Sequence, residues 1–321
     1  MARVSVGARL HFGFQNLSLA HERLYGGVGV ALDEPIVDVE ANRAPALDCD
    51  DDAVRPYLDR VVDVLDVPGA AVTVHERFDR HVGLGSGTQI ALATCVAVAN
   101  AYDVDVAVRD VAPALGRGGR SGIGVATFES GEFVVDGGHP TERFTVAPPE
   151  TGEWTVPPVV ARHEVPDRWR FVVAVPDADP GESGADEDAS MRSAVERADP
   201  GIAEDIATLV TQELLPAAAT ADLATFGDAV ARLGRLNGAW YADEQGGVYR
   251  PPAGTIIDHL SAVPTVAGAG QSSWGPAVYA LTTADGVDAA RTAARAGLEE
   301  ASHGGEVLVA RGRNDGATVT E

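Results

Sequence analysis

A glycine-rich loop at residues 83–89 has the composition of a phosphate cradle. Its glycines would let backbone N–H groups approach phosphate oxygens, and the apolar run that follows predicts a buried helix whose N-terminus adds about half a positive charge. The loop lacks the lysine of a Walker motif. The alternative interpretation is a turn in which the glycines serve backbone geometry alone. The candidate phosphate-binding residues here are Gly83, Gly85, Ser86, Gly87, Thr88 and Gln89.

A second glycine-rich loop, at residues 116–122, carries two arginines. Arg117 and Arg120 could each bind a phosphate through two parallel hydrogen bonds, because the guanidinium group is a planar fork of donors. All 24 basic residues of the chain are arginines, and 48 acidic residues outnumber them. Two arginines beside four glycines therefore favour an anion-binding loop, with a solvated turn as the alternative.

Three further positions could carry chemistry. Arg9 and His11 lie two residues apart on a predicted strand, so their side chains face the same side of it. Asp136 ends another predicted strand, close to an imidazole at His139. A third glycine-rich turn, residues 268–275, adds hydroxyl groups. Each of these features alone is more often structural than functional. Arg9, His11 and Asp136 are the catalytic candidates, and Gly270, Ser272 and Ser273 join the phosphate-binding candidates.

These residues need a scaffold that brings distant parts of the chain together. At roughly 150 residues per domain, 321 residues predict about two domains. Short strands and helices that do not alternate regularly predict α+β domains rather than a doubly wound sheet. A proline-rich stretch at 148–168 separates residues 1–160 from residues 161–321. The expected strands are 3–14, 36–41, 70–75, 123–129, 132–136, 170–175, 262–267 and 306–310, and the expected helices are 52–66, 90–102, 202–215, 222–240, 273–283 and 287–300, followed by a frayed tail.

The composition limits the partners and the environment. A net charge of −24 without a single lysine fits a protein that folds at very high salt, where screening relieves self-repulsion; codon bias in a GC-rich genome is the alternative. The sequence has no stripe of basic residues that would favour nucleic-acid binding, and it has no apolar stretch long enough to predict a membrane span. Cys49 and Cys95 stand apart from any cluster, which argues against a disulfide framework or a zinc site. We therefore expect a cytoplasmic protein.

Six strings, taken in chain order, resemble one family. RLHFGF, GGVGVAL, GLGSGTQIALA, GRGGRSGIG, VVDGGH and GQSSWGPAVYAL are similar to the GHMP small-molecule kinases, and within them to the β-ribofuranosylaminobenzene 5′-phosphate synthase branch. The resemblance implies a two-domain α+β fold of the GHMP-kinase type, with a ribosomal-protein-S5-like N-terminal domain and a ferredoxin-like C-terminal domain.

The resemblance also implies a reaction. Members of that branch transfer a phosphoribosyl group from phosphoribosyl pyrophosphate to 4-aminobenzoate or a similar aromatic acid, with loss of CO₂, in the synthesis of methanopterin. It implies small-molecule substrates and a Mg²⁺ cofactor, and it leaves homodimer formation open. Arg9 or His11 would position the acceptor carboxylate, and Asp136 would order the metal or the ribose hydroxyls.

One departure separates this chain from the kinases of the family. Several of those kinases carry an aspartate base in an SGxD string, and the matching string here ends in Gly124. Neither that carboxylate nor any lysine is available for phosphoryl transfer. The sequence therefore favours the synthase over an ATP-dependent small-molecule kinase, with a non-catalytic ligand-binding relative as a third interpretation.

Overall fold

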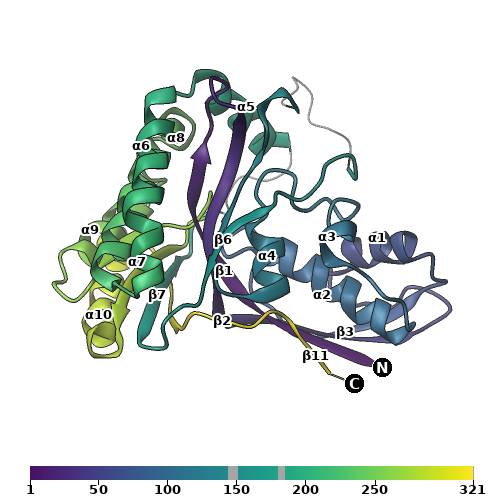
Figure 1. Cartoon of the computed structure of the whole chain (residues 1–321). Coiled ribbons are helices and arrows are strands. Elements are labelled where there is room, and N and C mark those ends of the chain that lie inside the picture. Colours follow the sequence, from purple (N-terminus) through teal and green to yellow (C-terminus); the bar gives the residue numbers. More distant parts are fainter. Residues whose placement is uncertain (144–150, 180–184, 321) are drawn as a thin grey trace.

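The computed structural model describes residues 1–143, 151–179 and 185–320, and its core is built on two antiparallel sheets (Figure 1). The first sheet has seven strands in the described residues, in the order β11-β1-β2-β4-β6, and β3 and β5 also pair with β2. The long hairpin of β1 and β2 is at the centre of this sheet, because most residues of both strands are buried. The strands are β1 (Ala2–Asn16), β2 (Arg23–Arg43), β3 (Ala70–Glu76), β4 (Phe133–Asp136), β5 (His139–Pro140), β6 (Val159–His163) and β11 (Thr318–Thr320).

Helix α2 (Ser86–Ala101) packs against β1 and β2 and is buried on nearly every side, as the apolar sequence predicts. Helix α1 (Arg55–Leu65) and helix α4 (Ile123–Ser130) pack on α2, and a single turn, α3 (Val108–Val111), lies beside α4. The helical layer therefore fixes the start of α2, which is where the first glycine-rich loop ends.

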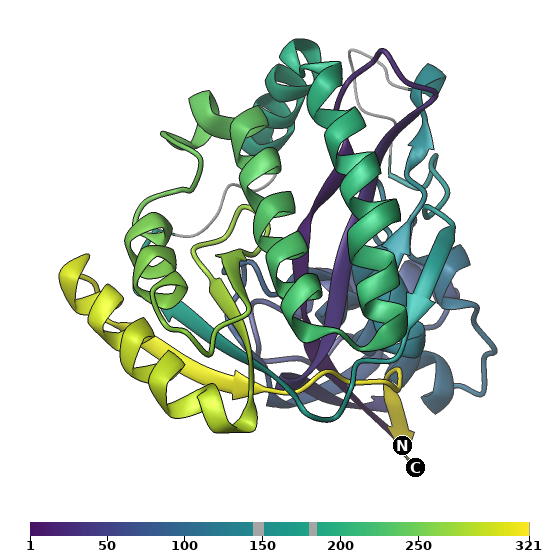
Figure 2. The same ribbon diagram turned by 60° about the vertical axis from the view of Figure 1, so that its left-hand side comes forward.

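The second sheet has, among the residues that the structure describes, four strands in the order β10-β7-β9-β8. Numbered along the chain this order is 4-1-3-2, and helices connect the first strand to the second and the third to the fourth, which is the ferredoxin-like arrangement. Helices α9 (Ala253–Ser261) and α10 (Val287–Glu300) share a hydrophobic core with this sheet (Figure 2). The strands are β7 (Trp169–Pro176), β8 (Gly268–Gln271), β9 (Val278–Thr283) and β10 (Gly305–Ala310).

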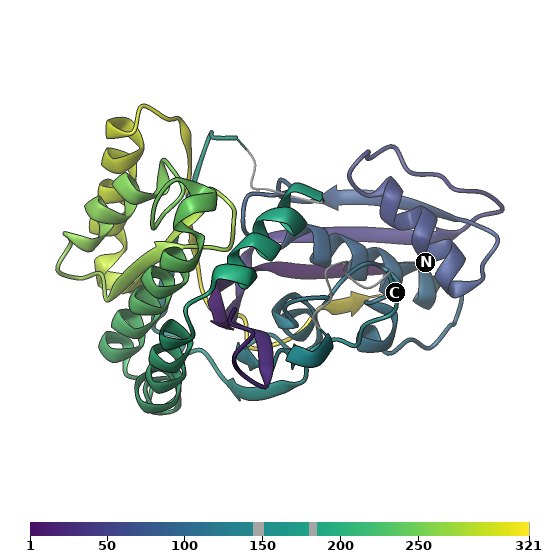
Figure 3. The same ribbon diagram turned by 90° about the horizontal axis from the view of Figure 1, so that it is seen from above.

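A group of helices joins the two sheets. Helix α8 (Leu223–Gln245) contacts both β8 of the second sheet and β1 of the first, and α6 also contacts β1 (Figure 3). The two sheets therefore pack as one body around the hairpin of β1 and β2. The other helices of this group are α5 (Ala185–Arg197), α6 (Pro200–Leu209) and α7 (Leu215–Thr220), with a π-helical turn at Val210–Leu214.

The two-domain α+β architecture is confirmed, but four local predictions are wrong. Residues 123–129 form helix α4 instead of a strand, and residues 273–283 form a turn and strand β9 instead of a helix. The strand expected at 262–267 begins at Gly268. The tail is not frayed, because β11 pairs with β1. Buried short segments are apolar in either conformation, so their pattern does not separate helix from strand.

The predicted boundary at residues 160 and 161 falls inside β6, which is paired with β4 of the first sheet. The first sheet therefore includes residues up to His163, and the last strand of the chain, β11, also belongs to it. Within the described residues no helix is both long and apolar enough to cross a membrane.

Candidate active site

The three glycine-rich segments converge on one cavity of about 850 Å³, a volume typical of small-molecule sites. We call it the arginine cavity, because five of the 24 arginines line it. The glycine-rich segments contribute Gly83, Gly85, Ser86, Gly87 and Thr88 from the first, Gly116, Arg117, Gly118, Gly119, Arg120 and Ser121 from the second, and Ser273, Trp274 and Gly275 from the third.

Helix α2 begins at the wall of the arginine cavity. Its N-cap residue, Gly85, has a φ of 83°, a left-handed conformation that glycine adopts without strain. No side chain caps the helix, and the first-turn residues Ser86, Gly87 and Thr88 line the cavity. The partial positive charge of the helix N-terminus therefore faces the cavity.

Ser272 ties the third segment to the first. Its buried hydroxyl donates to the carbonyl of Gly83 at 2.8 Å and accepts the backbone N–H of His11 at 3.1 Å. A Cβ on Gly275 would lie 2.2 Å from the backbone nitrogen of Gly83, so only glycine allows this approach. The two loops are thus held against strand β1.

Three predicted phosphate-binding residues lie outside the cavity lining. Ser272 has the internal role just described, and a Cβ on Gly270 would lie 2.6 Å from the Tyr279 hydroxyl. Gln89 is fully buried, and its amide donates to the carbonyl of Gly124 at 3.2 Å. The structure therefore places these residues in the scaffold and corrects their predicted position in the site.

Arg9 lies beneath the first loop. Its Nη1 donates to the carbonyl of Gly83 at 2.7 Å, and its side chain occupies the space that a Cβ on Gly85 would need. Burial lowers the pKa of Arg9 to about 10, so the guanidinium remains charged at neutral pH. Arg9 therefore adds a permanent positive charge to the cavity wall.

A hydrogen-bonded chain links His11, Ser121 and Asp136. The Nε2 of His11 lies 3.1 Å from the Ser121 hydroxyl, which lies 3.2 Å from the Asp136 carboxylate. That hydroxyl also accepts the N–H of Ile123 at 3.2 Å. Because the hydroxyl has one proton and donates it to Asp136, it must accept from His11, which assigns the proton to Nε2 and leaves Nδ1 as an acceptor.

The pKa values at the two ends of this chain are shifted by burial. Burial, together with the charge of Arg9, lowers the pKa of His11 to about 3, so the imidazole is neutral. Burial raises the pKa of Asp136 to about 6, although N–H groups of Gly138, Gly122 and Gly27 donate to its carboxylate. Asp136 is fully buried and lines neither cavity. It therefore orients Ser121, which corrects the predicted contact with a metal or ribose.

A smaller cavity of about 50 Å³ adjoins the first, and we call it the aromatic cavity. His11 lines it, and Ser273 and Trp274 line both cavities. For comparison, an engineered cavity of about 150 Å³ binds benzene, so a ring would rest at the junction of the two cavities, against Trp274. The rest of its lining consists of three glycines, Val248 and a set of aromatic and amide side chains, namely Phe12, Phe14, Tyr241, Tyr249, Asn237, Gln245 and Gln271.

Arg120 lines the arginine cavity but is already paired. Its Nη1 donates to Glu187 at 2.6 Å and its Nη2 donates to Asp188. A phosphate would have to displace these carboxylates, which sit at the start of α5. Arg117, by contrast, makes no ion pair in the described part of the chain. The structure thus separates two arginines that the sequence groups together.

The sequence analysis missed two cavity arginines, Arg60 and Arg80, and the tyrosine beside them, Tyr57. Arg80 lies three residues before Gly83 of the first glycine-rich loop, which is a signal that the sequence offered. Arg60 follows Tyr57 by three residues on α1, and this spacing places both on one helix face. Only the fold shows that this face borders the cavity.

The carboxylates at the cavity do not form a Mg²⁺ site as they stand. Glu187 and Asp188 line it, and both are paired with Arg120. No group of three or more histidine, cysteine or acidic side chains suited to a metal occurs in residues 1–143, 151–179 and 185–320. Mg²⁺ is commonly bound by few carboxylates together with substrate phosphates, so the ion would have to enter with its substrate.

Comparison with known proteins agrees with this geometry. Residues 52–132 match the model of the GHMP kinases N-terminal domain, and residues 214–300 match the GHMP kinases C-terminal model. The mevalonate kinase of L. major, solved with R-mevalonate, has a similar fold, with a TM-score of 0.70, 15% identity and coverage of 98% of this chain and 96% of that one.

Two curated relatives match over their whole length. A β-ribofuranosylphenol 5′-phosphate synthase from Methanothermobacter thermautotrophicus is 32% identical over 98% of this chain and 97% of its own. The protein of the same name from Archaeoglobus fulgidus is also 32% identical, over 99% of each chain. Their names specify a phenol, where the sequence analysis expected an aminobenzene.

Proposed function

This chain belongs to the GHMP kinase superfamily, in the same branch as its β-ribofuranosylphenol 5′-phosphate synthase relatives, and from that premise we propose that it is a decarboxylating phosphoribosyltransferase. The donor is phosphoribosyl pyrophosphate, and the acceptor is an aromatic acid. We put 4-hydroxybenzoate before 4-aminobenzoate as the acceptor, because the relatives' names specify a phenol. The product would serve methanopterin synthesis.

The observation that carries this proposal is the contrast between the two adjoining cavities. One is lined by five arginines and the N-terminus of α2, and the other by aromatic side chains. In a chain with a net charge of −24, the first suits a substrate with several phosphate groups. The second suits a flat ring at its junction with the first. A polyphosphate donor and an aromatic acceptor would therefore meet near Ser273 and Trp274.

The reaction balances without an added oxidant or reductant. The bond between the ribose anomeric carbon and pyrophosphate breaks, and pyrophosphate leaves with the electron pair. The ring carbon that bears the carboxylate forms a new bond to the anomeric carbon. The bond from that ring carbon to the carboxylate then breaks, CO₂ leaves, and the electron pair returns to the ring.

In this proposal, His11 and Arg9 bind opposite ends of the acceptor. Nδ1 of His11 is a neutral acceptor, which repels a carboxylate and accepts a hydrogen bond from a phenol hydroxyl. Arg9 is a cation at the wall of the larger cavity and attracts the carboxylate. From the sequence, either residue could position the acceptor carboxylate. The assignment of the His11 proton to Nε2 now favours Arg9 for this role.

Kinase chemistry is less well supported by the same site. A Cβ on Gly124 would lie 3.0 Å from Cγ2 of Thr88, so the position of the kinase aspartate is packed against α2 and carries no carboxylate. A kinase needs a group that positions or deprotonates the acceptor hydroxyl. None of the arginines at this cavity can act as that base, because they stay protonated.

The test is product identification by mass spectrometry. The protein would be incubated in molar KCl and Mg²⁺ with phosphoribosyl pyrophosphate and either 4-hydroxybenzoate or 4-aminobenzoate. We expect an aryl riboside phosphate that lacks the carboxylate, formed faster from 4-hydroxybenzoate. His11→Gln should slow its formation about 10²-fold while donor binding is kept. Conversion of ATP to ADP with a small alcohol, and no aryl riboside, would contradict the proposal.

A further inference from the structure

Two arginines contact one tyrosine at the α1 end of the arginine cavity, and a third arginine lines the cavity beside them. The guanidinium carbon of Arg117 lies 5.0 Å from the centre of the Tyr57 ring, and that of Arg80 lies 5.6 Å from it. Both side chains also donate to the Tyr57 hydroxyl, Arg80 at 3.5 Å. Arg60 lies one helical turn beyond Tyr57 on α1, and its Nη1 would lie 3.2 Å from a Cβ on Gly116. We call these four residues the Tyr57 cluster.

The Tyr57 cluster concentrates positive charge in an acidic chain. In the part of the chain that the structure describes, none of its arginines forms an ion pair with a carboxylate, although the chain has twice as many acidic as basic residues. Burial and the nearby charges of Arg80 and Arg60 lower the pKa of Arg117, although Tyr57 and the carboxylate of Glu187 act in the opposite direction. Three cations that repel one another are costly to hold together unless an anion binds between them.

Two buried nitrogen atoms point to the same conclusion. The Nε atoms of Arg80 and Arg117 are shielded from solvent and have no hydrogen-bond partner among the described residues. A buried donor without a partner is destabilising unless a bound ligand accepts its hydrogen bond. The first turn of α2 adds its partial charge at the same place, because a Cβ on Gly87 would lie 3.2 Å from Nη1 of Arg117.

We infer that the Tyr57 cluster is the diphosphate subsite, which holds the pyrophosphate that leaves the donor. The inference rests on the proposed function for the identity of the donor. Three cations and a helix N-terminus exceed what a sugar 5-phosphate needs, since a phosphate monoester carries a charge of about −1.5 to −2. A diphosphate carries more charge and presents more oxygens to the guanidinium groups.

The position of the Tyr57 cluster agrees with the geometry of displacement. The attacking ring and the leaving group must lie on opposite faces of the anomeric carbon. The aromatic cavity is lined by β1, α8 and the turn at Ser273 and Trp274, whereas the Tyr57 cluster is held by α1 and the residues that flank α2. Helices α1 and α8 lie on opposite sides of the molecule (Figure 1). The three arginines would therefore neutralise pyrophosphate as it departs from the acceptor.

The test is direct binding, measured by calorimetry without turnover. Inorganic pyrophosphate and ribose 5-phosphate would be titrated into the protein and into the variants Arg80→Gln and Arg117→Gln at one KCl concentration. We expect each variant to raise the Kd of pyrophosphate at least tenfold and the Kd of ribose 5-phosphate less than threefold. Arg295→Gln, an exposed arginine of α10, is the matched control and should change neither.

A second pair of variants controls for a folding defect in the glutamine variants. Arg80→Lys and Arg117→Lys keep the charge, and we expect them to keep most of the pyrophosphate affinity, with unchanged thermal melting. Pyrophosphate binding that is unchanged in both glutamine variants, or an equal loss for ribose 5-phosphate, would overturn the inference. Failure of the proposed reaction is a separate result, because it would appear as absent CO₂ release while pyrophosphate binding still depends on the Tyr57 cluster.

Discussion

At the scale of single residues, burial shifts the pKa values of two groups that share one hydrogen-bond chain. His11 is kept neutral, and the pKa of Asp136 is raised to about 6, which is close to neutral pH. The sequence could identify both as chemistry-bearing residues, since imidazole and carboxylate at strand positions are visible in it. It could not show that Ser121 lies between them, because that contact joins residues 110 positions apart.

Asp136 gives a testable dependence of stability on pH. Its pKa is raised by burial from 3.8 to about 6, so between these values the folded protein binds a proton that the unfolded chain has released. The contribution of Asp136 to stability therefore falls as pH rises through that range, by about 3 kcal/mol in total. Asp136→Asn removes this titration.

The check is chemical denaturation of the protein and of Asp136→Asn between pH 4 and pH 7. We expect the stability of the protein relative to the variant to fall by about 2.4 kcal/mol across this range, because part of the total change lies outside it. Parallel curves would show that Asp136 titrates normally in the folded state.

At the scale of elements, the start of α2 and the two loops around it decide the shape of the site. The sequence predicts α2 and the glycine loops well, because glycine followed by an unbroken apolar run has few other interpretations. It assigns 123–129 and 273–283 wrongly, because both segments are buried and rich in β-branched or small residues. Their conformations depend on packing against α2 and β7, which no local pattern reveals.

Ser272 tests the link between these elements. Ser272→Ala removes both the bond to Gly83 and the bond from His11, and it leaves a buried N–H without a partner. We expect a loss of about 1–3 kcal/mol in the free energy of unfolding and weaker donor binding, because the Gly83 carbonyl of the first loop keeps only one of its two side-chain hydrogen bonds, that of Arg9. Ser261→Ala, at an exposed position that ends α9, is the control for denaturation and calorimetry. Equal stability of both variants would mean that the loops are held by other contacts.

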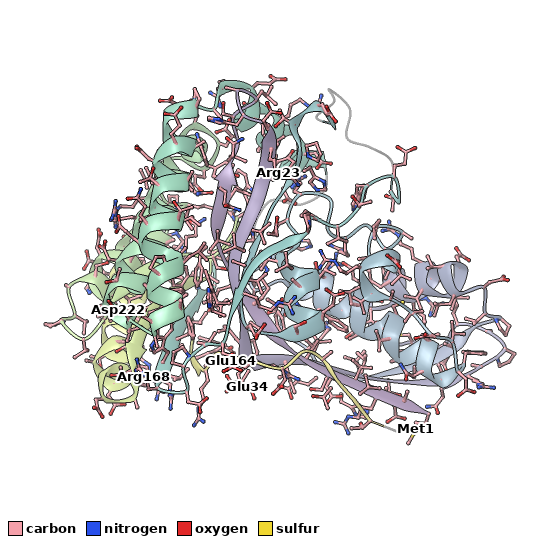
Figure 4. All side chains as sticks on the ribbon, in the orientation of Figure 1. Met1, Arg23, Glu34, Glu164, Arg168 and Asp222 are labelled. Carbon is pink, nitrogen blue, oxygen red and sulfur yellow. The ribbon has the colours of Figure 1, made fainter. Side chains whose placement is uncertain are left out.

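At the scale of the whole molecule, charge and domain packing set the conditions under which the site exists. Oxygen-tipped side chains project all around the molecule, and Glu34 is one of them (Figure 4). Partial burial and the charges of Glu76 and Asp33 raise the pKa of Glu34, which is a local sign of self-repulsion. The two-domain fold could be predicted from the sequence, whereas the return of β11 to the first sheet could not, since three exposed residues carry no burial pattern.

The melting temperature should therefore rise with salt. Screening shortens the range of repulsion from about 10 Å at 0.1 M to about 3 Å at 1 M, so a charge of −24 destabilises the fold less. We expect Tm, followed by circular dichroism, to increase as KCl is raised from about 0.1 M to about 2 M. A flat or falling Tm would leave codon bias as the explanation for the absence of lysine.

The central claim is that two adjoining cavities couple ribosyl transfer to decarboxylation, and one measurement tests it directly. The protein would be given 4-hydroxybenzoate labelled in its carboxyl carbon, with and without phosphoribosyl pyrophosphate, and CO₂ and pyrophosphate would be counted together. We predict release of both in equal amounts, and of neither when the donor is omitted. Release of CO₂ without the donor, or of pyrophosphate without CO₂, would contradict the claim.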